Sequence, residues 1–225
     1  MSSFTLNGYG GLILLGATTT LLVALAATAI GSVIGVLMAA AKLSPSRVLR
    51  HVASAYTTTI RGVPDLLVIF MVYYGGSSTL SHLFEHSIEI NAFTAGAVSL
   101  GLVFGAYATE IFRGAILEVP RGQSEAAAAL GLPGHRVFID VVAPQAWRLA
   151  IPAFGNQLTV LLKETALVSL VGLEDLMRRV GFAVEGTNRP FFFYLVAGAL
   201  YFVLSYFMTN AFSMARRKTT TTLAR

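Results

Sequence analysis

Two adjacent residues of opposite charge, Lys163 and Glu164, lie inside an otherwise apolar stretch of this 225-residue chain. A Lys or acidic residue at the centre of a membrane span costs about 2.5–3.5 kcal/mol, so both side chains are expected to face protein, water or a passing solute. Because neighbouring helical residues point about 100° apart, the two are expected to have separate partners. The alternative is that both lie near the outer end of a span, where a Lys side chain reaches the headgroups.

Two further sets of ionisable residues lie at the edges of apolar stretches. Arg61 and Asp65 are one helical turn apart, but Pro64 between them removes a backbone donor and predicts a helix start or break. Glu110 lies three residues before Arg113, so it either forms a local ion pair or anchors the following loop. These residues are candidates for structural or gating positions, and we favour a structural role for both sets.

The sequence offers no residues suited to thiol catalysis or to a catalytic metal site. The chain has no Cys, which excludes disulfides and thiol catalysis. The four His residues lie in predicted loops or at the ends of apolar stretches: His51, His82, His86 and His135. We therefore expect neither a metal site nor a hydrolytic cluster inside the membrane, which argues against an intramembrane enzyme.

The lysines exclude a nucleotide site of the P-loop type. Such a loop needs Gly-Lys-Ser/Thr so that the Lys reaches the phosphates. None of Lys42, Lys163 and Lys218 follows a Gly. The chain is expected to hold no cofactor and to be no enzyme of its own, so that any ATP and Mg²⁺ would be bound by a partner subunit.

The elements that position all these residues are membrane helices. Apolar residues make up 55% of the chain and charged residues 12%, with a mean hydropathy of +0.71, which leaves too little polar surface for a soluble domain. Five apolar stretches are long enough to cross a hydrocarbon layer of about 30 Å as helices. They are approximately 11–41, 56–75, 93–111, 149–170 and 191–214. We predict an all-α integral membrane fold with five transmembrane helices.

The distribution of basic residues sets the orientation, because Lys and Arg collect on the cytoplasmic side. Of the 16 Lys and Arg residues, twelve lie in segments 42–61, 113–148 and 216–225, three lie in 178–189, and Lys163 is the sixteenth. The N-terminus is therefore predicted outside and the C-terminus in the cytoplasm. The net charge of +5 reflects this topology, and we expect no nucleic-acid binding.

Two pairs of glycines predict close helix packing. Gly31 and Gly35 in the first stretch, and Gly101 and Gly105 in the third, each follow the GxxxG spacing that allows helix backbones to approach. We interpret both as packing motifs within the chain.

The third loop carries a helix suited to docking. Residues 125–130 read Glu-Ala-Ala-Ala-Ala-Leu and have high helix propensity, and Gly131, Pro133 and Gly134 predict its end. Six residues in and after this helix have the types and the spacing found in the EAA loop of ABC importer permeases, and the segment therefore resembles that loop. They are Glu125, Ala126, Ala127, Gly131, Val141 and Pro144. Segments 61–67, 106–127 and 162–176 extend the likeness, which covers roughly residues 16–213. They look like the polar amino acid branch, and within it the permeases of histidine, lysine/arginine/ornithine and opine systems.

The resemblance implies a type I importer in a bacterial inner membrane, with the chain a multi-pass protein surrounded by lipid. Two such permeases would face each other, two ATPase subunits would sit below them, and an extracytoplasmic binding protein would deliver the solute. The imported solute would be a polar amino acid, with basic amino acids and opines favoured. The coupling element that docks on the ATPase would consist of Glu125, Ala126, Ala127, Gly131 and Pro144.

The same likeness divides the chain into an outer N-terminal segment 1–15, a transmembrane domain 16–213 and a basic cytoplasmic tail 214–225. The coupling loop would span about residues 118–145. Glu164 departs from the family pattern, in which a small or shorter polar residue is more usual. An added carboxylate near a solute path would favour a cationic solute, although it would equally pair with Lys163 or with the partner permease. We hypothesise that Glu164, Thr165 and Ser169 line the path, with Lys163 a further candidate.

A stand-alone secondary transporter or channel is the alternative reading. It would use Lys163 and Glu164 as a charge relay, but it gives no account of the EAA spacing. Five spans also make a small transporter unless the chain dimerises.

Overall fold

The computed structural model describes residue 6, residues 8–85 and residues 89–221, and for residues 211 and 213–221 it describes the backbone alone. Its elements in chain order are α1 (Gly10–Leu43), α2 (Arg47–Gly62), α3 (Asp65–Phe70), η1 (Met71–Gly75), α4 (Gly76–Phe84), α5 (Ala92–Glu118), α6 (Arg121–Ala129), α7 (Gly134–Arg136), η2 (Val137–Val142), α8 (Ala143–Glu164), η3 (Thr165–Val171), α9 (Leu176–Thr187) and α10 (Pro190–Thr221). All of these are helical, as predicted. His86 lies outside the described residues.

Five helical segments are long and apolar enough to cross a membrane: Gly10–Leu43, Asp65–Phe84, Ala92–Glu118, Gly134–Val171 and Pro190–Asn210. Three of them overlap the predicted stretches closely, and the fourth begins at Gly134, 15 residues before the predicted start at residue 149, because η2 and the start of α8 continue the helix into the predicted loop. The second differs, because the predicted 56–75 is not one continuous helix. Pro64 has no amide hydrogen and holds Val63 in an extended conformation (φ −105°, ψ 139°), so α2 ends at Gly62 and α3 begins at Asp65. The predicted break at this proline is confirmed.

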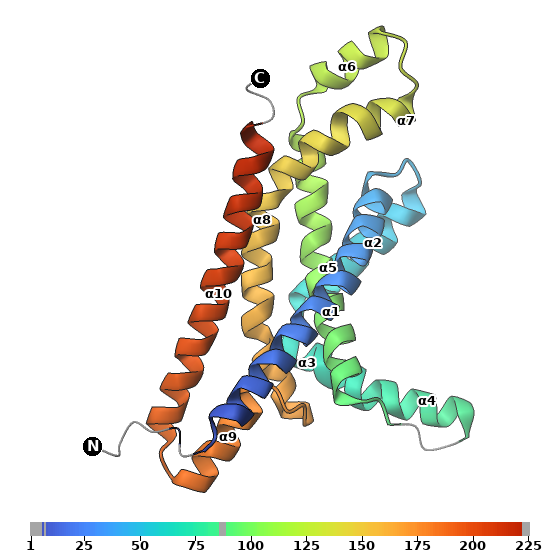
Figure 1. Cartoon of the computed structure of the whole chain (residues 1–225). Coiled ribbons are helices and arrows are strands. Elements are labelled where there is room, and N and C mark those ends of the chain that lie inside the picture. The colour runs from blue at the N-terminus through green and yellow to red at the C-terminus, as the bar shows by residue number, and fades with distance from the viewer. Residues whose placement is uncertain (1–5, 7, 86–88, 222–225) are drawn as a thin grey trace.

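Helix α1 crosses the bundle obliquely and packs along α5 (Figure 1). Its 34 residues extend for about 51 Å, which exceeds a hydrocarbon layer of about 30 Å and requires a tilt. The crossing point is built from the two GxxxG motifs. A Cβ atom on Gly31 would lie 2.7 Å from the carbonyl oxygen of Gly101, and one on Gly105 would lie 2.9 Å from Ile34. The predicted packing role of these glycines within the chain is confirmed.

The core surrounds α5, which is buried along most of its length. Its Leu100 and Phe104 pack with Phe154 and Leu161 of α8 and with Val168 of η3 in the middle of the bundle. A second cluster at the end of the bundle that carries α9 joins α1, α9 and α10. The first cluster fixes α8 against α5, and α8 carries the polar residues of interest.

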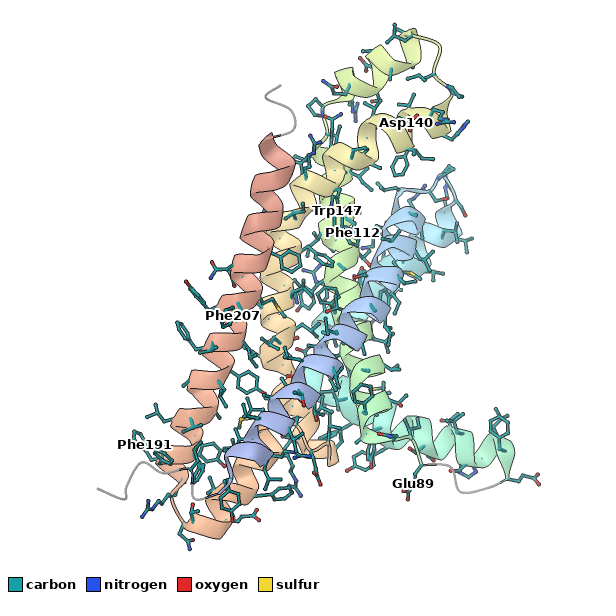
Figure 2. All side chains as sticks on the ribbon, in the orientation of Figure 1. Glu89, Phe112, Asp140, Trp147, Phe191 and Phe207 are labelled. Atoms are coloured by element: carbon teal, nitrogen blue, oxygen red, sulfur yellow. The ribbon has the colours of Figure 1, made fainter. Side chains whose placement is uncertain are left out.

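Two regions lie away from this core. Helices α6 and α7 project beyond one end of the bundle, the basic end assigned to the cytoplasm (Figure 1). Helix α4 projects sideways near the opposite end, and none of its residues is buried. The outward side chains of α10 include the exposed Phe191 and Phe207 (Figure 2).

Candidate functional site

The most unusual pair of side chains in the spans consists of two carboxyl groups. Asp65 is the first residue of α3 and Glu164 the last residue of α8, and their carboxyl groups lie within hydrogen-bonding reach of each other. Glu164 Oε2 is buried without a hydrogen-bond partner. Among the ion pairs of the described part of the chain, none involves either residue. The pair therefore places two acidic groups together, and no cation of the described residues forms an ion pair with them, although the charge of the neighbouring Lys163 acts on Glu164.

The helix ends explain how this pair arises. Pro64 starts α3 and so places Asp65 in its first turn, where the helix dipole stabilises a negative charge. Glu164 lies at the other kind of terminus, the last turn of α8, where the dipole opposes a negative charge. The two ends meet across the bundle, and the dipole of α8 would favour a positive group beside Glu164.

The neighbours predicted for these residues differ in part from the observed ones. Arg61 does not pair with Asp65: its guanidinium lies 5.0 Å from the centre of the Tyr107 ring, a cation–π contact. Lys163 is exposed and is not in an ion pair with Glu164 within the described residues, in keeping with the expected separate partners. The possible pairing of Arg61 with Asp65 is therefore replaced by the contact of Asp65 with Glu164.

Thr165 and Ser169 have their hydroxyl groups engaged locally. Thr165 is 1% exposed and donates to the carbonyl oxygen of Leu162 at 2.7 Å. Ser169 is half-buried and donates to the carbonyl oxygen of Ala166 at 2.7 Å. In this conformation Glu164 is the member of the predicted path that presents a polar atom without a partner.

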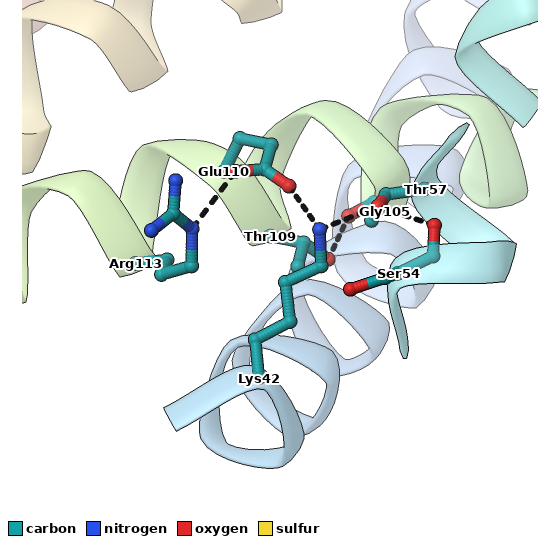
Figure 3. Close-up of polar contacts among 7 residues, drawn as sticks. All are labelled: Lys42, Ser54, Thr57, Gly105, Thr109, Glu110 and Arg113. Carbon is teal, nitrogen blue, oxygen red and sulfur yellow. Dashed lines mark hydrogen bonds and ion pairs between the residues drawn. The ribbon is translucent and has the colours of Figure 1, made fainter. Parts of the chain in front are cut away.

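Glu110 has a contrasting environment near the basic end of the bundle (Figure 3). One carboxylate oxygen accepts from the ammonium group of Lys42, and the other accepts from Arg113 Nε at 2.9 Å. Lys42 Nζ also donates to Thr57 Oγ1 at 2.6 Å. This network joins the last turn of α1, α2 and α5. The predicted local pair with Arg113 is confirmed, and sequence reasoning missed Lys42.

The predicted docking helix is α6. It ends where expected, because Gly131 adopts φ +84°, a conformation that favours glycine. The amide of Leu132 then donates back to the carbonyl oxygen of Ala127 at 3.3 Å. Pro133 follows and prevents the helix from continuing.

The five predicted coupling residues divide into two groups by exposure. Ala127 is 5% exposed, and α6 packs through this side against η2. Glu125 and Ala126 are exposed, as is Leu130 beyond them at 84%. Pro144 is exposed near the start of α8, directly after the π-helical segment η2. The helix thus presents small residues, one carboxylate and one leucine at the cytoplasmic end.

Residues 31–219 match the model of the family described as "Binding-protein-dependent transport system inner membrane component". The chain belongs to this family. As a permease of this family it is the inner membrane component of an ABC transporter, and ATP hydrolysis is done by separate subunits. The resemblance identified from the EAA spacing is confirmed.

Relatives of this permease match it over nearly its whole length. The octopine transport system permease of Agrobacterium tumefaciens (strain Ach5) is 41% identical over 97% of this chain and 94% of the relative. The histidine/lysine/arginine/ornithine transport system permease of Escherichia coli (strain K12) is 41% identical over 89% of this chain and 90% of its own length.

Solved structures bear out the fold of the permease. A chain of the crystal structure of an amino acid ABC transporter with histidines is 35% identical, with a TM-score of 0.83 that covers 93% of this chain and 95% of that one. An inward-facing methionine ABC transporter is 21% identical with a TM-score of 0.78, covering 97% and 99%, and supports the fold alone. The predicted transmembrane domain of a type I ABC importer is confirmed.

Proposed function

We propose that this permease imports basic amino acids or opines and that the carboxyl pair of Asp65 and Glu164 contacts the cationic group of the solute. The observation that carries the proposal is the meeting of two acidic groups inside the bundle, neither of which is in an ion pair within the described part of the chain. The relatives named above are permeases for octopine and for histidine, lysine, arginine and ornithine, and a further relative is the nopaline permease of Agrobacterium fabrum. The solutes named for the Escherichia coli relative include the basic amino acids lysine and arginine.

Electrostatics favours a cation at this position. Two carboxylates side by side repel each other, and the repulsion is stronger in a protein interior than in water. A guanidinium or ammonium group placed against both would relieve the repulsion and form charge-assisted hydrogen bonds. A guanidinium also has the planar set of donors that matches carboxylate oxygens in pairs. A neutral side chain would leave the repulsion in place, so the pair would discriminate between cationic and neutral solutes.

The assembly is the second part of the proposal. Two permeases would face each other, two ATPase subunits would hold ATP and Mg²⁺, and a solute-binding protein would deliver the solute from outside. Helix α6 would dock on the ATPase through Glu125, Ala126 and Leu130, because these residues are exposed beyond the bundle. Ala127 and Gly131 would hold the helix in place, the first by packing on η2 and the second by ending the helix.

Uptake by the reconstituted transporter in liposomes tests the solute site. We expect Glu164→Gln, and separately Asp65→Asn, to lower ATP-driven uptake of arginine more than tenfold while ATP hydrolysis stimulated by the binding protein persists. Glu174→Gln is the matched control, because Glu174 is an exposed carboxylate outside the spans. Unchanged arginine uptake in both variants of the carboxyl pair would refute the assignment.

The coupling role needs a different readout. Glu125→Lys is expected to leave the chain in the membrane but to abolish the stimulation of ATP hydrolysis by the loaded binding protein. Arg121→Gln, on the same helix, is the control. Intact stimulation in the Glu125→Lys variant would contradict the coupling role of α6.

The secondary transporter has less support from the geometry. Its charge relay needs Lys163 and Glu164 to be bonded to each other, whereas Lys163 is exposed and acts on Glu164 through its charge alone, and Glu164 lies within hydrogen-bonding reach of Asp65. Uptake driven by an ion gradient in vesicles that contain this chain alone would favour that reading over ours.

A further inference from the structure

An apolar groove of about 460 Å³ lies at the cytoplasmic end of the bundle, apart from the carboxyl pair and the docking helix. We call it the inner groove. Its floor consists of three buried alanines, Ala39 of α1, Ala115 of α5 and Ala146 of α8. Phe112 and Trp147 stand over this floor with their rings stacked, 6.4 Å between centres and 29° between planes (Figure 2). The groove is therefore an elongated apolar space between three helices.

The surroundings of the inner groove indicate that it opens toward lipid. Val36 of α1, which lines it, is 55% exposed, and its neighbour Leu37 is also exposed. Trp147 is 51% exposed at the basic end, and tryptophan is enriched where membranes meet water. Apolar space of this kind gives water few hydrogen-bond partners, so an apolar filling is favoured.

One end of the inner groove carries positive charge. Ser44 lines this end, and Arg50 Nη1 donates to the carbonyl oxygens of Ser44 and Pro45, both at 2.9 Å. Arg47 lies one turn earlier on α2 and is exposed. Neither arginine is in an ion pair within the described ranges, whereas the nearby Lys42 and Arg113 are both matched by Glu110.

Helix α2 itself has the character of an interfacial helix. Its first half exposes Val48, Leu49 and Val52 between the two arginines and the following turn. A helical segment with exposed apolar residues on one side and arginines on the other has the composition of segments that bind where headgroups meet acyl chains, whereas the second half of α2 packs into the bundle through Ala53 and Thr57. The inner groove therefore combines a positive end, at Ser44 and Arg50, with an apolar part, which is the combination that a headgroup and its acyl chain require.

We infer that the inner groove binds an anionic glycerophospholipid of the cytoplasmic leaflet. One acyl chain fills the space between Ala39, Ala115 and Trp147, and the phosphate group lies against Arg47 and Arg50. An anionic lipid fits better than a zwitterionic one because the two arginines have no acidic partner in the described residues. This site is independent of the proposed solute.

Trp147 offers a direct test because it is the only tryptophan of the chain. The full chain is reconstituted in vesicles of phosphatidylcholine and phosphatidylglycerol in which one or the other lipid carries dibrominated acyl chains. Bromine quenches tryptophan on contact, so titration of the lipid mixture gives the relative affinity of the two headgroups for the position beside Trp147. We expect a preference of about tenfold or more for phosphatidylglycerol, since each arginine near the surface favours an anionic lipid about fivefold.

Substitutions test whether the preference for phosphatidylglycerol beside Trp147 arises from the inner groove. Arg50→Gln is expected to lower the preference about fivefold, whereas Arg189→Gln, an exposed arginine at the other end of the bundle, leaves it unchanged. Ala40→Leu narrows the groove from an exposed lining position and is expected to reduce quenching, whereas Ala29→Leu on the same helix is not. An unchanged emission maximum without bromine shows that Trp147 keeps its surroundings.

Two results would overturn the inference. Equal quenching by the two lipids would show that only the ordinary lipid shell reaches Trp147. A preference for phosphatidylglycerol that survives Arg50→Gln together with Arg47→Gln would show that the arginines do not select the headgroup.

Discussion

Glu110 and Glu164 are both glutamates within membrane-spanning helices, yet their surroundings are opposite. Glu110 accepts from Lys42 and Arg113, so its charge is neutralised by the chain itself. Glu164 faces the carboxyl group of Asp65 and keeps one buried oxygen without a partner. A charge that is paired within the protein stabilises one arrangement of helices. An unpaired buried charge raises the free energy of the folded chain, and a cation that binds to it lowers that free energy again. The comparison separates a structural anchor, Glu110 with Lys42 and Arg113, from the proposed solute site, Asp65 with Glu164.

Removal of the anchor is expected to have the largest effect on stability. Glu110→Ala leaves Lys42, which is 12% exposed, and Arg113 without their anion, and should lower the free energy of unfolding by about 3–5 kcal/mol. Chemical denaturation in detergent micelles measures this loss. The double variant Lys42→Met with Glu110→Leu should lose less than Glu110→Ala alone, because no lysine is then left uncompensated. Equal stability of Glu110→Ala and the parent chain would contradict the anchoring role.

Asp175 extends the comparison to a third carboxyl group, which lies outside the spans. It is fully buried, caps α9 by accepting from the amide of Arg178 at 2.9 Å, and keeps Oδ2 without a partner. Burial raises the pKa of Asp175 to about 6, although hydrogen bonds from the backbone act in the opposite direction. The ionised form is therefore less favourable in the folded chain than in the unfolded chain.

The sign of the pH dependence follows from this raised pKa. The contribution of Asp175 to stability is fully present below its ordinary pKa, near 4, and is lost as the pH rises through about 6. Asp175→Asn keeps a good capping residue and should stabilise the chain at pH 7 by up to about 3 kcal/mol, with little difference near pH 4. Denaturation curves at the two pH values measure this. A larger stabilisation at pH 4 than at pH 7 would contradict the argument.

The crossing of α1 and α5 brings together the two helices that carry Lys42 and Glu110. A substitution at this crossing is expected to have a smaller effect on the free energy of unfolding. Gly31→Ala would bring a Cβ atom to 2.7 Å from a backbone oxygen of Gly101, so the helices must separate, at a cost of about 2 kcal/mol. Gly198→Ala on α10 meets no atom within 4 Å and should be neutral or slightly stabilising. Denaturation midpoints of the two variants test whether the close approach matters. Equal midpoints would show that the crossing tolerates the added methyl group.

The smallest expected change in stability belongs to the proposed solute site, where the sign of the change is informative. Glu164→Gln removes one of two neighbouring carboxylates and should stabilise the chain or leave it unchanged, on the order of 1 kcal/mol, while arginine uptake falls. Glu110→Ala has the opposite pattern, because its loss of uptake follows the loss of folded protein. Measurement of both quantities on both variants separates the roles. A Glu164→Gln variant as unstable as Glu110→Ala would remove the distinction between the two sites.

The features that the sequence predicts well are those with a local signal. The five spans follow from apolar length, and the end of α6 follows from the backbone preference of Gly131. The crossing of α1 and α5 uses both glycine pairs, whose four-residue spacing marks one face of a helix. The break before α3 follows from Pro64, although the single apolar stretch 56–75 obscured where the helices begin and end.

The features that the sequence does not reveal depend on contacts between distant segments. Glu110 meets Lys42 from another helix, and local spacing pointed to Arg113 alone. Asp65 meets Glu164 across the bundle, and the nearest candidate in sequence, Arg61, lies over Tyr107 instead. Periodicity states which residues share a helix face, but which faces meet is decided by the packing around α5.

The fourth span is a continuous helical segment that connects the two ends of the molecule. Helical residues run without interruption from Gly134, beside the docking helix, to Glu164 and beyond. From η2 to Glu164 this segment is about 40 Å long and contains Pro152; in a movement of the segment as one rigid body, a rotation of about 5° at its cytoplasmic end would displace the carboxylate by about 3.5 Å. That is more than the length of a hydrogen bond. A small stroke delivered through α6 would therefore suffice to separate Glu164 from Asp65 and to release whatever cation the pair holds.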